Sequence, residues 1–224
     1  MNQDPNVASV ELAVKALGSL IDELILVGGC AVGLLITDDA RPPIRPTIDV
    51  DLLTEVAPLI SYYKLCDRLK ERGFKENPEV ICRWQRNDLK IDVMPTDGSV
   101  LGFTNSWYAE AARNPIKHQL PSGLFINVIA SPLFLATKLE SFASRGGHDY
   151  LHHDMEDIVN LVDGRPSLVE EVLGSVADAR DYIRDEFEAL LIDPLFDDRL
   201  VWLLQGEHER KSIVRERMRK IAGL

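Results

Sequence analysis

Residues 47–52 read Thr-Ile-Asp-Val-Asp-Leu, and polar and apolar side chains alternate along the whole stretch. A period of two predicts a β-strand with one apolar face and one acidic face. Asp49 and Asp51 share the acidic face, about 7 Å apart along the backbone. Two neighbouring carboxylates are costly unless they face solvent or bind a cation. The pair therefore predicts either a solvated strand face or a cation site.

A third carboxylate lies in a second region with strand character. Residues 80–86 and 89–94 predict a β-hairpin, and Asp92 lies among apolar residues in its second strand. If this strand is a neighbour of the first, Asp92 converges with Asp49 and Asp51. Three carboxylates suit Mg²⁺ or Mn²⁺. Two such ions can clamp the attacking and leaving oxygens of a phosphoryl transfer.

Gly28-Gly29 supplies a complementary feature upstream of the acidic strand. The pair follows the apolar run 24–27 and precedes a predicted helix over 30–36. Small residues before a helix let backbone N–H groups approach a phosphate, and the helix N-terminus favours an anion. A Gly-Gly pair alone is usually a turn, so the order of the features, rather than any one of them, favours a phosphate site.

The pattern of the whole chain predicts the α+β class, with a small mixed or antiparallel sheet, flanking helices and a helical C-terminal half. Helices over 7–20 and 57–72 and a hairpin around 121–129 complete the first half. Ser131-Pro132 is typical of a helix start. The helices expected after it cover 132–145, 154–163, 167–191, 195–205 and 208–222. We therefore expect two domains, residues 1–130 and 131–224.

The composition is that of a globular protein, with 46% hydrophobic and 27% charged residues. A net charge of −11 argues against broad, sequence-blind binding of nucleic acid. Residues 207–224 contain six basic and three acidic residues and predict an amphipathic helix. This helix is either a small phosphate-contacting surface or, more commonly, an ordinary solvated terminal helix.

No signal peptide or membrane span is expected from the sequence. The N-terminus lacks a basic region and an apolar core, and the longest apolar stretch, residues 24–36, is too short to cross a bilayer. The three cysteines have no paired or metal-type spacing. These features predict a cytoplasmic protein with reduced cysteines and no membrane partner.

Several motifs together resemble the signature of the polymerase-β-like nucleotidyltransferase superfamily, and within it the AbiEii/AbiGii-type toxin nucleotidyltransferases. The resemblance spans about residues 20–165, well over half of the chain. Its motifs are residues 28–31 (Gly-Gly-Cys-Ala), 45–52 (Arg-Pro-Thr-Ile-Asp-Val-Asp-Leu), 91–93 (Ile-Asp-Val), 136–142 with Arg145, and Asp154-x-x-Asp157.

The resemblance implies an enzyme that uses an NTP as substrate and Mg²⁺ or Mn²⁺ as cofactor. Asp49, Asp51 and Asp92 are implied as catalytic metal ligands, and Asp92 also as an aid in deprotonating the attacking hydroxyl. The implied nucleotide-binding residues are Gly28, Gly29, Thr47, Lys138, Arg145, Asp154 and Asp157. The chain departs from the family at His153, where a basic residue often precedes the first of the two aspartates.

The residues themselves leave the role of the Lys138 region open. Lys138 and Arg145 lie on one face of a predicted helix and need an anionic partner. That partner is either a triphosphate or the pair Asp154 and Asp157, which are one helical turn apart. The histidines at 148, 152 and 153, together with these aspartates, also resemble a transition-metal or histidine–aspartate hydrolase site, but structural hydrogen bonds at a helix start are expected instead.

Three functions remain open from the sequence. The first is transfer of a nucleoside monophosphate from an NTP to an acceptor hydroxyl, with tRNA as the acceptor and an antitoxin protein as partner, as the resemblance implies. The second is the same reaction on a small molecule such as an antibiotic. The third is a non-catalytic nucleotide-binding or interaction protein. Stabilisation by NTP only in the presence of Mg²⁺ favours the enzymes.

Overall fold

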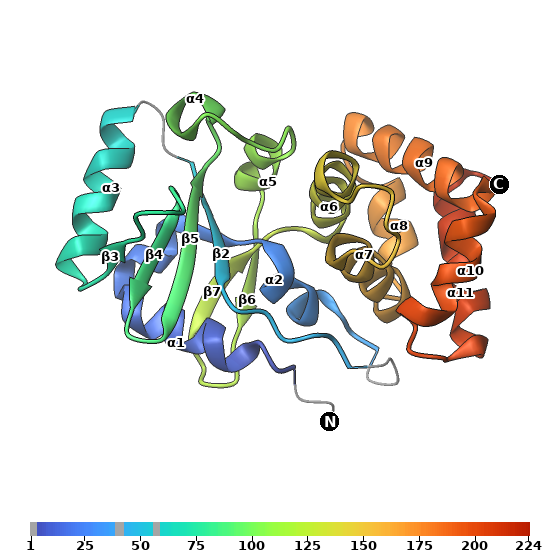
Figure 1. Ribbon diagram of the computed structural model, residues 1–224, viewed down its shortest axis with the longest axis horizontal. Helices are drawn as coiled ribbons and strands as arrows, with labels where there is room; N and C mark the ends of the chain where they lie inside the picture. Colours follow the sequence, from blue (N-terminus) through green and yellow to red (C-terminus); the bar gives the residue numbers. More distant parts are fainter. Residues whose placement is uncertain (1–3, 39–42, 56–58) are drawn as a thin grey trace. The chain divides into compact units, whose positions relative to one another are not determined.

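The computed structural model describes residues 4–38, 43–55 and 59–224. These residues form two compact units, and each is described by itself (Figure 1). Asp4–Leu34 and Arg45–Ala130 form the first, which we call the sheet unit. Leu35–Ile44 and Ser131–Leu224 form the second, the helical unit. Within the described part of the chain, no helix combines the length and the apolar character that a membrane crossing needs.

One seven-stranded mixed sheet organises the sheet unit, in the order β3-β4-β5-β2-β1-β7-β6. The pairs β2–β5 and β1–β7 are parallel, and the other neighbours are antiparallel. The strands are β1 (Leu24–Leu26), β2 (Val50–Thr54), β3 (Lys75–Glu76), β4 (Arg83–Arg86), β5 (Leu89–Pro95), β6 (Ile116–Gln119) and β7 (Phe125–Val128). The predicted class is confirmed, and so are the two predicted hairpins, β4–β5 and β6–β7.

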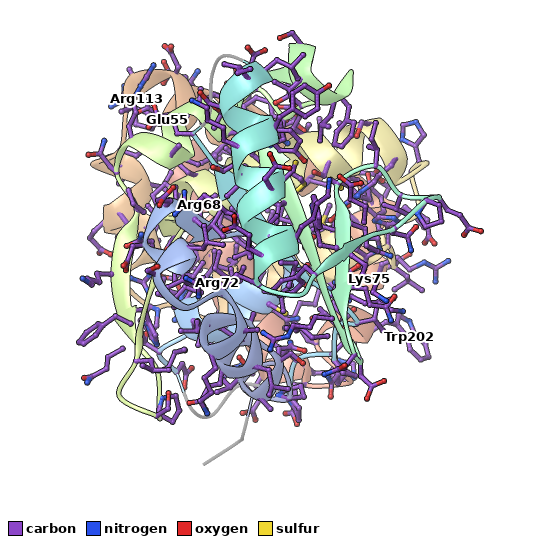
Figure 2. All side chains as sticks on the ribbon, turned by 90° about the vertical axis from the view of Figure 1, so that its left-hand side faces the viewer. Glu55, Arg68, Arg72, Lys75, Arg113 and Trp202 are labelled. Carbon is purple, nitrogen blue, oxygen red and sulfur yellow. The ribbon has the colours of Figure 1, made fainter. Side chains whose placement is uncertain are left out.

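Helices flank this sheet, and the longer ones, α1 (Val7–Leu17) and α3 (Leu59–Glu71), bury an apolar stripe. The others are the 3₁₀ helix η1 (Gly18–Glu23), α2 (Gly28–Leu35), α4 (Gly98–Leu101) and α5 (Tyr108–Arg113). In Figure 1, α3 stands to the left of β4 and β5, and Figure 2, seen from that side, shows it in front of the sheet. Tyr62 of α3 donates a hydrogen bond to the carbonyl of Val93 on β5.

The end of α3 is tied to the chain segment before β1. Arg68, labelled in Figure 2, forms two hydrogen bonds of 2.6 Å with the carboxylate of Glu23. Arg72 donates to the carbonyl of Leu17 at 2.6 Å. These contacts place two positively charged side chains near the C-terminus of α3, where the helix dipole favours positive charge.

The helical unit is built around buried apolar side chains of six helices, among them Phe134 and Phe187. The helices are α6 (Ser131–Arg145), α7 (His153–Gly164), α8 (Leu168–Leu173), α9 (Ala177–Ile192), α10 (Pro194–Leu203) and α11 (His208–Ala222). The segment after α2 belongs to this unit: the backbone N–H groups of Thr37 and Asp38 both donate to the carbonyl of Gly164, each at 2.9 Å.

Some element boundaries differ from those expected. The acidic strand begins at Val50 rather than Thr47, and Ile48, expected on its apolar face, is 78% exposed. The single helix expected over 167–191 is broken into two, α8, which has Gly174 as its C-cap, and α9. The helix expected over 7–20 ends at Leu17 and continues as η1. Residues 57 and 58 of the expected helix 57–72 lie outside the described part.

Candidate active site

Two of the predicted carboxylates lie on neighbouring strands of the sheet unit. β2 and β5 run parallel at the centre of the sheet, and Asp51 is the direct register partner of Asp92. Asp49 lies just before the first residue of β2. The condition for convergence, that the two strands are neighbours, is therefore met. Asp92 is buried, whereas Asp49 and Asp51 are half-buried.

Arg83, which the sequence did not indicate, stands within this cluster. It lies opposite Asp92 in the β4–β5 pairing. Its Nε donates to Oδ1 of Asp92 and its Nη2 donates to Oδ2 of Asp92, both at 2.8 Å. The same Nη2 also donates to Oδ2 of Asp49. The hydrogen bonds that Arg83 donates to Asp92, together with the charges of Asp92 and Asp49, raise the pKa of the Arg83 guanidinium. Arg83 was missed because its cross-strand partner becomes visible only once the register is known.

The donor set fits a divalent cation. Oxygens of Asp49 and Asp92 both reach one positively charged nitrogen atom, so both carboxylates can contact one cationic centre. Asp51 adds a carboxylate on the adjacent strand. Mg²⁺ and Mn²⁺ prefer oxygen ligands of this type. The metal-binding roles of the three aspartates stay predictions.

Gly28 is required by the position of Asp51. Its φ is +63°, and a Cβ added there would lie 1.8 Å from Oδ2 of Asp51. Asp51 therefore directs its carboxylate to the first residue of α2, where only glycine leaves room for it. Gly29 follows in the same first turn. A helix N-terminus offers unpaired N–H groups to an anion, which is the arrangement the phosphate prediction requires.

Asn6 anchors the segment that leads into Asp49. Its Oδ1 accepts a hydrogen bond from the backbone N–H of Thr47 at 2.8 Å, and its Nδ2 donates to the carbonyl of Arg45 at 3.2 Å. Asn6 is 1% exposed, so these bonds satisfy a buried side chain. Asn6 was also missed, since an Asn before a helix is usually only a cap.

Thr47 and Cys30 contact each other behind the carboxylates. Oγ1 of Thr47 lies 2.8 Å from Sγ of Cys30, and this thiol also donates to the carbonyl of Asp49 at 3.2 Å. Burial raises the pKa of the Cys30 thiol to about 12, so it stays protonated at neutral pH. Cys30 is thus a small buried residue rather than a nucleophile.

The other predicted nucleotide-binding residues lie in the helical unit and contact one another. Nζ of Lys138 is 3.0 Å from Oδ1 of Asp154 and 2.7 Å from Oδ2 of Asp157. Arg145 donates to both oxygens of Asp154, at 2.8 and 2.9 Å. Burial alone would raise the pKa of Asp154, but Arg145 and Lys138 outweigh it and hold that pKa well below its usual range. Of the two partners considered from the sequence for Lys138 and Arg145, the structure contains the aspartate pair. Nucleotide binding by these residues stays a prediction.

A tighter group of possible metal donors lies beside that network. In the described ranges, ligand atoms of His152, His153 and Asp154 lie within 4.8 Å of one another, and the carboxylates around Arg83 are spread more widely than this. However, Nδ1 of His152 accepts the backbone N–H of Asp154 at 3.2 Å and caps α7. Both oxygens of Asp154 are bonded to Arg145. These contacts are the structural hydrogen bonds expected at this helix start.

The basic C-terminal helix α11 uses much of its charge within the helical unit. Arg210 bonds both Asp163, at 2.7 Å, and Asp38, also at 2.7 Å. Lys211 and Arg215 both bond Asp197. These ion pairs leave less positive charge for the phosphate-contacting surface considered from the sequence.

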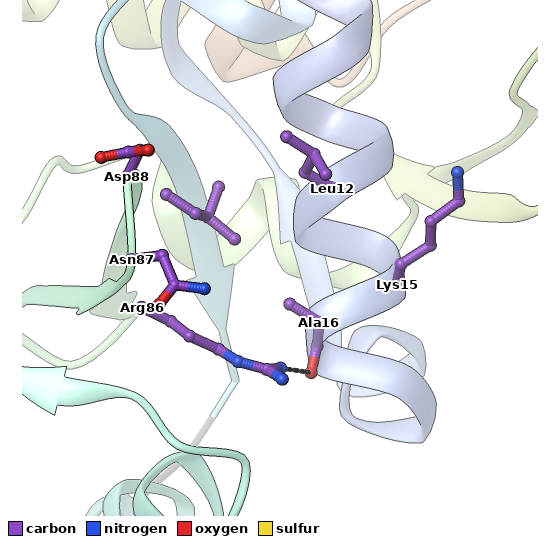
Figure 3. Close-up of a pocket in the computed structure, with 7 residues that line it drawn as sticks. Leu12, Lys15, Ala16, Arg86, Asn87 and Asp88 are labelled. Atoms are coloured by element: carbon purple, nitrogen blue, oxygen red, sulfur yellow. Dashed lines mark hydrogen bonds between the residues drawn. The ribbon is translucent and has the colours of Figure 1, made fainter.

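A pocket of about 370 Å³ lies between α1 and the turn of the β4–β5 hairpin (Figure 3). Its polar lining includes Lys15, Asn87 and Asp88. Arg86 closes one side by donating to the carbonyl of Ala16 at 3.3 Å, drawn as the dashed line in Figure 3. The pocket contains none of the predicted site residues.

Comparison with known proteins identifies the fold. No protein-family model matches the sequence, and no curated protein matches it. A crystal structure of an antigenic nucleotidyltransferase-like protein from Paracoccidioides brasiliensis superposes with a TM-score of 0.53. The match covers 89% of this chain and 94% of that chain, at 17% sequence identity. The fold is nucleotidyltransferase-like. At this identity the likeness concerns the fold alone, and in a nucleotidyltransferase-like fold the chemistry has to be argued from the site.

Proposed function

We propose that this protein transfers a nucleoside monophosphate from an NTP to an acceptor hydroxyl, with a divalent cation as cofactor. The observation that carries the proposal is the contact of Asp49 and Asp92 with one cationic nitrogen, with Asp51 in register beside them. The nucleotidyltransferase-like fold supports it. The Gly28 position, which accommodates the Asp51 carboxylate at the start of α2, supports it further.

Each part of the site has a proposed role. Asp49, Asp51 and Asp92 hold Mg²⁺ or Mn²⁺, which when bound neutralises charge on the phosphates and polarises the reacting oxygens. Gly28 and Gly29 offer the first turn of α2 to the phosphates. The acceptor oxygen forms a bond to the α-phosphorus and the bond to pyrophosphate breaks. Asp92 receives the hydroxyl proton.

The proposed acceptor is tRNA, because the motifs of residues 28–31, 45–52 and 136–157 resemble those of AbiEii/AbiGii-type toxins. In that setting an antitoxin protein is the partner, the cytoplasm is the place of action, and Lys138 and Arg145 contact the nucleotide. Modification of tRNA would block translation and inhibit growth.

A second candidate acceptor is a small cationic molecule such as an antibiotic. The ion pairs of Arg210, Lys211 and Arg215 within the helical unit favour it, because they reduce the positive charge that α11 presents to a nucleic acid. The net charge of −11 also suits a cationic substrate better than tRNA.

Label transfer tests the reaction and separates the two acceptors. Each α-³²P-labelled NTP is incubated with the protein and Mg²⁺, once with total cellular tRNA and once with a pool of cationic antibiotics. The proposal predicts label on one pool with the wild type and with Asp88→Asn, which changes an exposed carboxylate on the β4–β5 turn. The double variant Asp49→Ala/Asp51→Ala should transfer none. Equal transfer by that variant would contradict the mechanism, and no transfer by the wild type would favour a non-catalytic nucleotide-binding protein.

A further inference from the structure

Arg83 on β4 contacts two of the three carboxylates that the proposed function assigns to the divalent cation. Its guanidinium forms two parallel hydrogen bonds with Asp92 and a third with Asp49, and its side chain is 20% exposed. A guanidinium bound in this way is held in both position and orientation. The carboxylates therefore already have a cation between them.

A divalent ion needs the same oxygens. Asp49, Asp51 and Asp92 carry three negative charges, and Arg83 neutralises one of them. A divalent ion that binds Asp49 and Asp92 together competes with Nη2 of Arg83 for the carboxylate of Asp49. We propose that Arg83 is a positioning residue: it is a resident counter-cation of Asp49 and Asp92, and it releases Asp49 when the divalent cation binds. The inference rests on the divalent-cation cofactor of the proposed function.

Asp49 is released because its bond to Arg83 is the weaker attachment. Arg83 and Asp92 are cross-strand partners in a regular β-ladder, and two bonds of 2.8 Å join them. Asp49 lies outside β2 and is joined to Arg83 by one bond. Each carboxylate oxygen of Asp92 accepts one bond from Arg83 and keeps a second lone pair for a metal ion. Arg83 can thus go on orienting Asp92 after Asp49 has moved to the ion.

This arrangement predicts that Arg83 weakens the affinity for divalent cations while it stabilises the metal-free protein. A unit charge about 5 Å from a divalent ion changes its binding by roughly tenfold, even at the dielectric constant of water. Replacing Arg83 by a neutral residue therefore removes both the competitor and the repulsion. A role limited to holding the strands together would not increase metal affinity when it is lost.

Calorimetric titration of the full chain with Mn²⁺, without nucleotide or acceptor, tests the proposal. The proteins are the wild type, Arg83→Gln, Arg83→Lys and Arg86→Gln. We expect Arg83→Gln to bind Mn²⁺ at least about tenfold more tightly than the wild type. Arg83→Lys keeps the charge but loses the planar fork and should fall between them. Arg86→Gln, on the same strand but bonded to Ala16 instead of a carboxylate, should match the wild type.

Unchanged or weaker Mn²⁺ binding by Arg83→Gln would overturn the proposal, and so would a lack of Mn²⁺ binding by both proteins. If Arg83→Gln does not fold without metal, Mn²⁺ should restore its native circular dichroism at a concentration below the dissociation constant that the wild type has for Mn²⁺. If Mn²⁺ does not restore it, the proposal is also overturned. Because no nucleotide is present, the outcome is separate from that of label transfer. A protein that binds Mn²⁺ as expected but transfers no label would leave Arg83 in its role and refute the proposed reaction.

Discussion

The carboxylate of Asp51 lies so close to the backbone of Gly28 that only glycine fits at position 28. The Asp51 carboxylate lies where a Cβ of residue 28 would be, and the backbone there has a positive φ. An L-residue in that conformation costs roughly 1–2 kcal/mol even without a steric conflict. At Gly28 the conflict is added to this cost, and it involves a carboxylate of the proposed metal site.

Gly28→Ala is therefore expected to destabilise the protein more than the backbone strain alone and to displace Asp51. The matched control is Gly123→Ala, because Gly123 has a φ of +82° and an added Cβ there meets no heavy atom within 4 Å. The control should lower the melting temperature by about 2–4 °C for each kcal/mol of strain. Gly28→Ala should lower it at least about twice as much and should also weaken Mn²⁺ binding. Equal effects of the two substitutions would contradict the close approach of Asp51 to Gly28.

The elements that the sequence predicts well are those whose pattern is local. The β4–β5 hairpin follows from alternation on both sides of a polar turn, and α6 follows from Ser131-Pro132. The predicted start of the acidic strand was wrong, because Ile48 fits the alternation although it is 78% exposed. Alternation reports which side chains point the same way, but not where the neighbouring strands begin.

The candidate site shows the same limit. Asp49, Asp51 and Asp92 could be singled out because carboxylates among apolar residues are conspicuous in a sequence. Arg83 and Asn6 could not, since an arginine in an exposed-looking strand and an asparagine near a helix start are common. Their roles arise from the β4–β5 register and from a contact between residues 41 positions apart.

The helices α6 and α7 are joined by buried ion pairs that make a pH-dependent contribution to stability. Asp154 is fully buried between Lys138 and Arg145, and its pKa in the folded protein lies well below the ordinary value of 3.8. A carboxyl group with a depressed folded-state pKa stabilises the fold above its unfolded pKa. That stabilisation is lost as the pH falls from about 3.8 towards the folded-state value.

We expect Asp154→Asn to lower the free energy of unfolding at pH 7 by about 3 kcal/mol or more, because two cations lose their buried partner. The difference from the wild type should stay constant above about pH 5 and shrink below pH 3.8. Urea unfolding from pH 7 to pH 3 measures it. Asp181→Asn is the control, since the side chain of Asp181 is 47% exposed and paired with Arg184 on α9, and it should change stability little at any pH. A pH-independent difference for Asp154→Asn would contradict the ion-pair assignment.

On the scale of the whole molecule, the chain passes between its two units more often than a simple division at residue 130 suggests. The segment Leu35–Ile44 is grouped with the helical unit, through Asp38 and its bond to Arg210. It then leads directly to Thr47 and Asp49 of the sheet unit. The expected domains, 1–130 and 131–224, therefore stay a prediction, and all proposed metal ligands belong to the sheet unit.

The most direct test of the proposed nucleotidyl-transfer site is nucleotide binding that depends on both the metal ion and the carboxylates of β2 and β5. The measurement is the melting temperature of the full chain with Mn²⁺ and a non-hydrolysable NTP analogue, each alone and together. Ligand bound only by the folded state raises the melting temperature, by an amount set by its concentration over its dissociation constant. The wild type and Asp88→Asn should be stabilised by the pair together beyond the sum of the two alone, and Asp51→Asn should not. The same stabilisation in Asp51→Asn, or none in the wild type, would contradict the assignment of this cluster as the nucleotidyl-transfer site.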